Sequence, residues 1–208
     1  MVICALQNVS YKVENQSILK NISLEILPGE RVCLMGDNGC GKTTLLKIAA
    51  GLQSPSQGTA VLTTDIGWIP QFLAPPQGGE QVGDFLALRK KGRPVPSRAE
   101  LFELLNKDDP LHIKALFAKQ QALAQLSGGE WKRVQLQRVL WDMPTALFIW
   151  DEPETDLDRT HREILANLMC KFSTHVANPP AFLFSTHDMH FATKCATRIL
   201  NLREGHFV

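Results

Sequence analysis

The chain has 208 residues, enough for one domain with a sizeable core, and 44% of them are hydrophobic, which excludes a disordered protein. Its net charge of +1 gives no general attraction to nucleic acid or to an anionic membrane. No apolar run approaches the roughly 20 residues of a membrane-spanning helix, and no secretion signal stands at the N-terminus. We therefore expect no nucleic-acid partner and no insertion into a membrane. Five scattered cysteines are typical of reduced thiols in the cytosol.

The first seventy residues alternate short strands with turns. Strands are predicted over 2–6, 22–26 and 31–35, and the last is a continuous apolar run typical of a buried strand. A helix over 43–50 follows a glycine-rich loop and ends at Gly51, and the sequence predicts two more strands, over 59–62 and 66–69.

The middle of the chain has helical character. Apolar residues recur at helical spacing between 82 and 125, with an interruption over 92–96. Helices are then predicted over 130–141, 159–172 and 191–197, alternating with strands over 146–150, 181–184 and 198–202. This alternation predicts an α/β fold, with a mostly parallel sheet covered on both faces and a small helical subdomain inserted into it.

A phosphate-binding loop is the first motif with chemical content. Gly36-Asp-Asn-Gly-Cys-Gly-Lys-Thr43 lies between a predicted strand and a predicted helix, the context that this motif requires. The glycines allow backbone N–H groups to surround phosphate oxygens at a helix N-terminus. We expect Lys42 to reach the β- and γ-phosphates and the Thr43 hydroxyl to bind Mg²⁺. The predicted nucleotide-binding residues here are Gly36, Asp37, Asn38, Gly39, Cys40, Gly41, Lys42, Thr43 and Thr44.

Cys40 lies inside this loop and has two interpretations. A thiolate is favoured near a helix N-terminus and a lysine, so Cys40 is a candidate reactive thiol that bound ATP would protect. The alternative is a small residue that fills a tight space.

An acidic pair ends the apolar strand predicted over 146–150. We expect Asp151 to hold the Mg²⁺ site and Glu152 to polarise the attacking water as a general base. A carboxylate pair after a run of apolar residues is not typical of a solvated strand end.

Gln71 and His187 also follow predicted strands. The Gln71 amide oxygen is a candidate ligand of Mg²⁺ and a contact of the attacking water, although a glutamine at a strand end is usually only solvated. His187 is a candidate partner of the γ-phosphate, with a purely structural histidine as the alternative. We count both among the catalytic candidates, with Glu152.

The order of these motifs, with Leu126-Ser-Gly-Gly-Glu130 between Gln71 and the acidic pair, resembles the nucleotide-binding domain of ATP-binding cassette (ABC) proteins over essentially the whole chain. Leu-Ser-Gly-Gly-Glu is the signature of that family. The resemblance implies one ABC ATPase domain over 1–208, with the helical subdomain at about 80–140 and a small antiparallel β-subdomain, here shortened. It also assigns Tyr11 to adenine stacking, with an exposed strand residue as the alternative, and Asp158 to the loop that links two cassettes.

The signature segment has the features of an anion-binding helix N-terminus, which agrees with that resemblance. Ser127 caps the following helix, and Gly128 and Gly129 leave its N–H groups open to an anion. In the family, this helix end binds the γ-phosphate held by the P-loop of a second subunit. The resemblance therefore implies a pair of cassettes, expected to be a homodimer, that closes around ATP and Mg²⁺.

The resemblance implies an ATPase subunit that powers a transporter from the cytoplasmic face of the inner membrane. Separate permease subunits would dock near Gln71 and the helical subdomain, at Phe72, Leu73 and the 75–76 loop. The alternative is an ABC ATPase outside transport, of the cluster-assembly or translation-factor type. Two departures from the family, Glu154 for a usual threonine and the bulky Trp150, touch no catalytic group.

Overall fold

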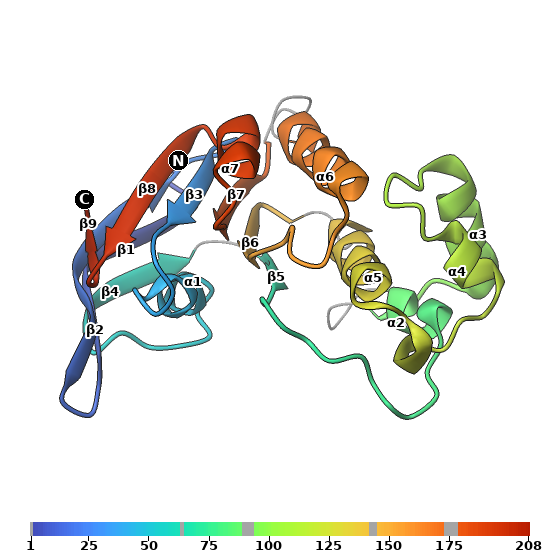
Figure 1. Cartoon of the computed structure of the whole chain (residues 1–208), viewed down its shortest axis with the longest axis horizontal. Coiled ribbons are helices and arrows are strands. Elements are labelled where there is room, and N and C mark those ends of the chain that lie inside the picture. The colour runs from blue at the N-terminus through green and yellow to red at the C-terminus, as the bar shows by residue number, and fades with distance from the viewer. Residues whose placement is uncertain (1, 63–64, 89–93, 142–144, 173–178) are drawn as a thin grey trace. The chain divides into compact units, whose positions relative to one another are not determined.

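The computed structural model describes residues 2–62, 65–88, 94–141, 145–172 and 179–208 (Figure 1). The chain divides into two compact units, each assembled from separate stretches of sequence. The first unit comprises Met1–Pro70, Pro144–Pro153 and Ala166–Val208, and the second comprises Gln71–Met143 and Glu154–Leu165. The helical stretch predicted over about 80–140 lies within the larger segment of the second unit.

A six-stranded sheet with the order β5-β6-β7-β3-β8-β9 forms the centre of the first unit. All its neighbouring strands are parallel except β8 and β9, which are antiparallel. The predicted mostly parallel sheet is therefore confirmed. The strands are β3 (Arg31–Met35), β5 (Ile66–Ile69), β6 (Leu147–Asp151), β7 (Ala181–Ser185), β8 (Arg198–Arg203) and β9 (His206–Phe207).

A second, antiparallel sheet has the order β2-β1-β4. It contains β1 (Cys4–Val13), β2 (Gln16–Ile26) and β4 (Gln57–Leu62). The strands predicted over 2–6 and 22–26 were too short, because β1 and β2 continue to a hairpin at Glu14. Register shifts beyond Leu6 break the alternation of apolar and polar residues on which the prediction depended.

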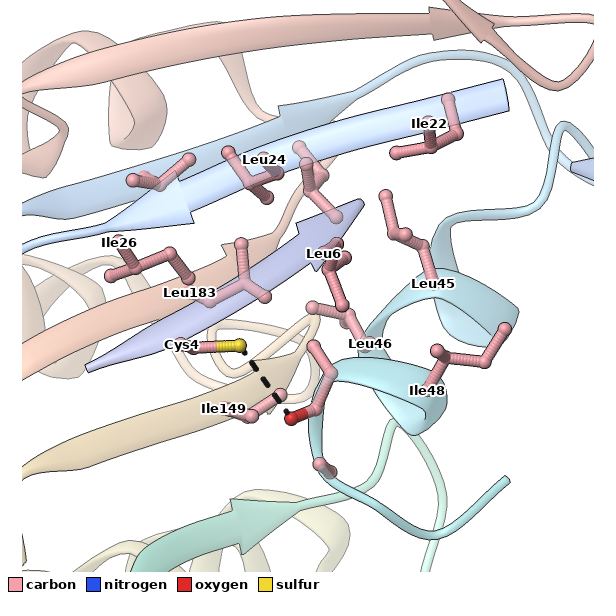
Figure 2. Packing of buried hydrophobic residues seen from close by; sticks show 14 of the residues in the cluster. Cys4, Leu6, Ile22, Leu24, Ile26, Leu45, Leu46, Ile48, Ile149 and Leu183 are labelled. Atoms are coloured by element: carbon pink, nitrogen blue, oxygen red, sulfur yellow. Dashed lines mark hydrogen bonds between the residues drawn. The ribbon is translucent and has the colours of Figure 1, made fainter. Parts of the chain in front are cut away.

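Helix α1 (Lys42–Ala49) joins the two sheets of the first unit into one core. Leu45, Leu46 and Ile48 are buried against strands of both sheets, and Figure 2 shows them beside Leu6 of β1 and Ile149 of β6. The helix ends before Gly51, which has a left-handed φ of 69°. This core holds the N-terminal end of α1, which follows the phosphate loop, in a fixed place at the sheet.

The second unit is helical within the described residues. It contains α2 (Val82–Ala87), α3 (Arg98–Lys107), α4 (Lys114–Ala118), a 3₁₀ turn (Leu123–Gln125) and α5 (Gly128–Trp141), shown in green to yellow in Figure 1. Phe102 stacks on Phe117, and the Arg98 guanidinium lies 4.6 Å from the Phe117 ring centre. The interruption predicted over 92–96 lies partly outside the described residues.

The last two helices of the chain, α6 and α7, precede strands β7 and β8 of the first unit. Helix α6 (Arg159–Phe172) matches its prediction, whereas α7 (Met189–Cys195) begins two residues earlier than predicted because the Asp188 side chain accepts a hydrogen bond from the Phe191 N–H. The strand β9 was not predicted, since two residues carry no periodicity. No helix in the described ranges combines the length and the apolar character of a membrane span.

Candidate functional site

The phosphate loop runs from the end of β3 into α1, as the sequence predicts. The Lys42 ammonium folds back over the loop and donates to the carbonyl oxygens of Gly36, at 2.7 Å, and Asp37, at 3.0 Å. Thr43 and Thr44 lie half-buried in the first turn of α1, and Asp37, Asn38 and Gly39 are exposed. The loop therefore has its lysine positioned over its own backbone.

Two glycines of the loop are required by their surroundings. Gly36 has a φ of 145°, and a Cβ there would lie 2.1 Å from the Leu202 carbonyl oxygen. Gly41 has a φ of 109°, and a Cβ there would lie 2.8 Å from the Leu19 side chain. Both positions combine a left-handed backbone with a close approach, which only glycine accommodates. The loop can thus lie tightly against the sheet that carries it.

Asp151 and Glu152 lie at the carboxyl end of β6, where β7 runs beside it in parallel register. The Thr43 hydroxyl donates to Asp151 Oδ2 at 2.6 Å, and the Ser185 hydroxyl donates to Asp151 Oδ1 at 2.5 Å. Both carboxylate oxygens of this buried residue are therefore fixed. We call Thr43, Asp151, Glu152, Ser185 and His187 the acid cluster.

Glu152 is held by two neighbours in the acid cluster. Its N–H donates to the Ser185 hydroxyl at 3.0 Å, and its Oε1 lies 2.5 Å from His187 Nε2. Its backbone has a φ of 47°, a left-handed conformation that non-glycine residues rarely adopt. The Glu152 side chain is buried while His187 is 43% exposed, so a solvent-facing imidazole covers a nearly enclosed carboxylate.

A cavity of about 250 Å³ lies beside the phosphate loop in the first unit. It is lined by the start of β2, by Gly39 and Cys40, and by Glu204 and Gly205. Tyr11, on β1, packs half-buried against the unit's core. Its stacking on adenine therefore stays a prediction. Gly39 and Cys40 were predicted to bind nucleotide, whereas the walls from β2 and the 204–205 turn come from residues that the sequence did not single out.

The signature segment begins α5 in the second unit. The Ser127 hydroxyl accepts from the Glu130 N–H at 3.3 Å and donates to the Glu130 carboxylate at 2.8 Å, and that carboxylate accepts the Ser127 N–H at 2.9 Å. This reciprocal cap is a capping box. The two hydrogen bonds from Ser127 hold the pKa of Glu130 below its usual range.

The glycines of the signature differ in their roles. A Cβ on Gly129 would lie 2.7 Å from the Asp156 carbonyl oxygen, whereas a Cβ on Gly128 would lie 3.4 Å from the Asp156 side chain. Gly129 thus allows the helix start to contact the 156–158 segment. The sequence predicts only that both glycines leave the N–H groups of the helix start open to an anion, and it gives no sign of this contact.

The structure brings the signature and Asp158 together. Ser127, Gly129 and Asp158 line one cavity of about 400 Å³ in the second unit. The Asp158 carboxylate caps α6 by accepting from the His161 N–H at 2.8 Å, and it lies 2.9 Å from His161 Nδ1. These bonds hold the pKa of Asp158 below its usual range.

Arg133 and His161 are residues of this second cavity that sequence reasoning missed. Arg133 donates from Nη1 to the carbonyl oxygens of Leu111 and His112, both at 3.0 Å, and lies 3.4 Å from His161 Nε2. The cavity therefore combines a helix N-terminus and a guanidinium, both of which attract an anion, with the carboxylates of Glu130, Asp156 and Asp158. Ser127 and Arg133 are six residues apart, which is not the spacing of one helix face, so the sequence carried no signal for this grouping.

Gln71 begins the second unit, at the edge of a small groove of about 140 Å³. The Lys132 ammonium donates to the Gln71 carbonyl oxygen at 3.2 Å, and the Trp131 indole N–H donates to the Leu73 carbonyl oxygen at 2.5 Å. Phe72 is 81% exposed beside this groove. The role of Gln71 toward Mg²⁺ and water stays a prediction.

The ligands of Mg²⁺ are oxygen atoms, commonly one or two carboxylates together with substrate phosphates and waters. Thr43 and Asp151 present a hydroxyl and a carboxylate side by side. Within the described ranges, no group of three or more His, Cys, Asp or Glu side chains lies close enough together to hold a metal ion. These residues fit an ion that is shared with a nucleotide, rather than one held by the protein alone.

The fold and the loop define the class, an α/β ATPase with a phosphate loop between β3 and α1. The family described as ABC transporter matches residues 19–155. The chain is 34% identical to the zinc import ATP-binding protein ZnuC of Psychrobacter arcticus over 96% of its own length and 79% of the relative's. It is 33% identical to the lipoprotein-releasing system ATP-binding protein LolD of Pseudomonas fluorescens, over 94% and 90%. The chain belongs to the ATP-binding cassette family of ABC transporters.

Solved structures show the same fold. A metal-chelate type ABC transporter in an inward-facing conformation matches with a TM-score of 0.82 at 22% identity, covering all of this chain and 82% of the other. A dimeric cassette bound to ADP and phosphate matches with a TM-score of 0.82 at 24% identity, covering 98% and 96%. The predicted family and ATPase activity are confirmed, and the chain is an ATP-hydrolysing subunit of an ABC transporter. Such a subunit works with a membrane permease and with a second cassette.

Proposed function

We propose that the acid cluster hydrolyses ATP with Mg²⁺. The cavity lined by Ser127, Gly129 and Asp158, here called the signature cavity, of a second copy of the chain completes each site. The observation that carries this proposal is the distribution of the polar groups. Lys42, Asp151 and Glu152 lie in the first unit, whereas Ser127 and Asp158 line a separate cavity of the second unit. Each unit contains one half of a phosphate site.

In this proposal, Lys42 releases the loop carbonyls and binds the β- and γ-phosphates. Thr43 and Asp151 would hold Mg²⁺, which supplies charge neutralisation on the phosphates. The Glu152 carboxylate, oriented by His187, accepts a proton from the water that attacks the γ-phosphorus. The bond from the γ-phosphorus to the bridging oxygen breaks, and ADP leaves with its electron pair. Ser127 and the N–H groups of Gly128 and Gly129, all from the second copy of the chain, stabilise the negative charge on the transferred phosphoryl group.

A complementation experiment tests the shared site. Lys42→Ala disables the phosphate loop of one copy, and Ser127→Arg blocks the signature cavity of another copy. Each variant alone should be inactive. A mixture should regain ATPase activity, because one site in each mixed pair combines an intact loop with an intact signature.

If signature and loop of one chain acted together, every site in the mixture would carry one defect and no activity would return. Equal activity of the separate variants and the mixture therefore contradicts the homodimeric site. Size-exclusion chromatography of the mixture with ATP should show the pair, and it gives a second measurement that does not depend on turnover.

We also propose that the permease docks at the groove beside Gln71. Gln135 lines this groove, is 4% exposed, and has an Oε1 atom without a hydrogen-bond partner among the described residues. A buried acceptor without a donor is costly, so a docking segment that supplies one is favoured. Phe72 and Leu73 add exposed apolar surface at the same place.

Two similarly exposed leucines of the second unit provide a matched test of docking. Leu73 is 45% exposed at the groove, and Leu104 is 41% exposed on α3. Leu73→Ala should release the chain from native membranes of its own organism, whereas Leu104→Ala should remain bound. Both should keep the basal ATPase rate. Equal retention of the two variants would contradict the docking site.

The cytoplasmic face of the inner membrane is the proposed location. All five cysteines are free in the structure, which agrees with a reducing compartment. Protease added to sealed inverted membrane vesicles should digest the chain, and protease added to right-side-out vesicles should leave it intact.

A zinc importer is the proposed transporter class, because the relatives include zinc import proteins at 34% and 35% identity over 96% of this chain. Deletion should impair growth under zinc limitation, and added zinc should restore it. Lipoprotein release, the process named for a relative at 33% identity, predicts a growth defect that zinc does not correct.

A further inference from the structure

Ser185 links the two acidic residues of the acid cluster through one hydroxyl. It ends β7, directly opposite Asp151 in the parallel register of β6 and β7, and it is completely buried. Its Oγ donates to Asp151 Oδ1 at 2.5 Å and accepts the Glu152 N–H at 3.0 Å. A single side-chain atom thus fixes a carboxylate and the next peptide group.

The two bonds act on different parts of the site. With Oδ1 of Asp151 held by Ser185, the other oxygen, Oδ2, is directed at the Thr43 hydroxyl. The bond to the Glu152 N–H supports a backbone with a φ of 47°, which must be held in place by its surroundings. That backbone in turn aims the Glu152 carboxylate at His187.

We infer that Ser185 is a positioning residue for hydrolysis, which orients Asp151 toward the metal site and Glu152 toward the attacking water. The inference rests on the proposed roles of Asp151 and Glu152. Ser185 touches neither nucleotide nor water in this assignment, and its hydroxyl neither gives up nor takes up a proton. It acts through the residues that it holds, as a partner of metal ligands does in many sites.

Ser185→Ala removes the hydroxyl and leaves the strand intact. Loss of a group that supports a metal ligand commonly costs about 10–100-fold in metal affinity or activity, and we expect kcat to fall within that range. The Mg²⁺ concentration for half-maximal activity should rise about tenfold. ATP affinity in EDTA should stay within about twofold, because Lys42 and the loop are unchanged.

The melting temperature tests the effect of Ser185 on Mg²⁺ binding without any ATP hydrolysis. Addition of Mg²⁺ to the ADP complex should raise the melting temperature of the wild-type protein, and this increase should shrink in Ser185→Ala. A purely structural loss would lower both melting temperatures by the same amount and leave their difference unchanged, which would overturn the inference.

A pair of variants with the same shape separates the hydroxyl from packing. Ser185→Thr keeps the hydroxyl and Ser185→Val replaces it with a methyl group. The threonine variant should recover most of the Mg²⁺ dependence and kcat, and the valine variant should resemble alanine. Equal losses in the two variants, or wild-type Mg²⁺ dependence and kcat in Ser185→Ala, would overturn the inference.

Thr197→Ala is the control for the loss of a hydroxyl elsewhere in the first unit. The Thr197 hydroxyl bonds to both backbone groups of Arg31, at the opposite end of β3 from the phosphate loop. Its removal should leave the Mg²⁺ dependence unchanged. Glu152→Gln, measured alongside, separates the proposed role of Glu152 from the positioning role of Ser185. Wild-type turnover in Glu152→Gln refutes the proposed role of Glu152, whereas an inactive Glu152→Gln with a wild-type Ser185→Ala refutes only the inference.

Discussion

The acid cluster of the first unit and the signature turn of the second, Leu126–Glu130, are built by opposite means. Thr43, Asp151 and Ser185 come from three distant parts of the chain and meet at the carboxyl ends of β6 and β7. In the signature turn, Ser127 and Glu130 are three residues apart and cap one helix. One site depends on the tertiary fold and the other on local sequence. Substitutions in the acid cluster should therefore affect chemistry most, and those in the signature turn should affect local stability as well.

The largest expected effect tests the acid cluster. Glu152→Gln should keep ATP binding but slow hydrolysis by about 10²–10⁴, the usual contribution of a positioned general base. Single-turnover phosphate release measures the rate, and size-exclusion chromatography should show a dimer that persists with ATP. Turnover at the wild-type rate would remove Glu152 from this role.

The next effect tests how tightly the signature turn is packed. A methyl group on Gly129 meets the Asp156 carbonyl oxygen, so Gly129→Ala should lower the stability by about 1–3 kcal/mol. Gly128→Ala meets only an ordinary contact with the Asp156 side chain and serves as the control. Urea unfolding compares the two, and equal stability would mean that the close approach is relieved elsewhere.

A smaller effect tests the local cap of the signature turn and its pH dependence. Ser127→Ala should cost about 1 kcal/mol at pH 7. Because the folded-state pKa of Glu130 is depressed, its contribution is present above the usual glutamate pKa of about 4.3 and is lost as the pH falls through the lower folded value. The difference between wild type and variant should therefore shrink as the pH falls below the usual glutamate pKa.

The capping box of Ser97 and Glu100 on α3 provides a matched control for that variant. Ser97→Ala should shift the melting temperature in the same direction as Ser127→Ala but leave ATPase activity unchanged. Loss of activity in both variants would mean that the local cap, rather than the signature cavity, limits turnover.

The smallest effect concerns thiol reactivity in the first unit. Burial raises the pKa of the Cys4 thiol to about 11, so this thiol should stay unlabelled in the folded protein. Cys40, half-buried in the phosphate loop, should react with a maleimide, and ATP should slow that reaction. Cys170, also half-buried, serves as the control whose labelling ATP should not change. Mass spectrometry of the labelled peptides measures all three.

Much of the fold was predictable because local patterns are strong in this chain. The strand over 31–35 and the helix over 159–172 have the predicted bounds, since the strand is a continuous apolar run and the helix has apolar residues at helical spacing. The β1–β2 hairpin was underestimated because its register shifts hide the alternation, and β9 is too short to carry a pattern. The order of the strands in the sheet required the tertiary structure.

The sequence by itself determined the phosphate loop, the acidic pair and the capped signature helix, because each depends on residues close together in the chain. The order of these motifs along the chain then determined the family. Only the tertiary structure decided that Ser185 holds both acidic residues, that Gly129 contacts the Asp156 backbone, and that Arg133 and His161 share a cavity with Ser127. The physical reason is distance along the chain. A hydrogen bond between residues 151 and 185 leaves no periodicity in the sequence, and it forms only when two parallel strands align their carboxyl ends.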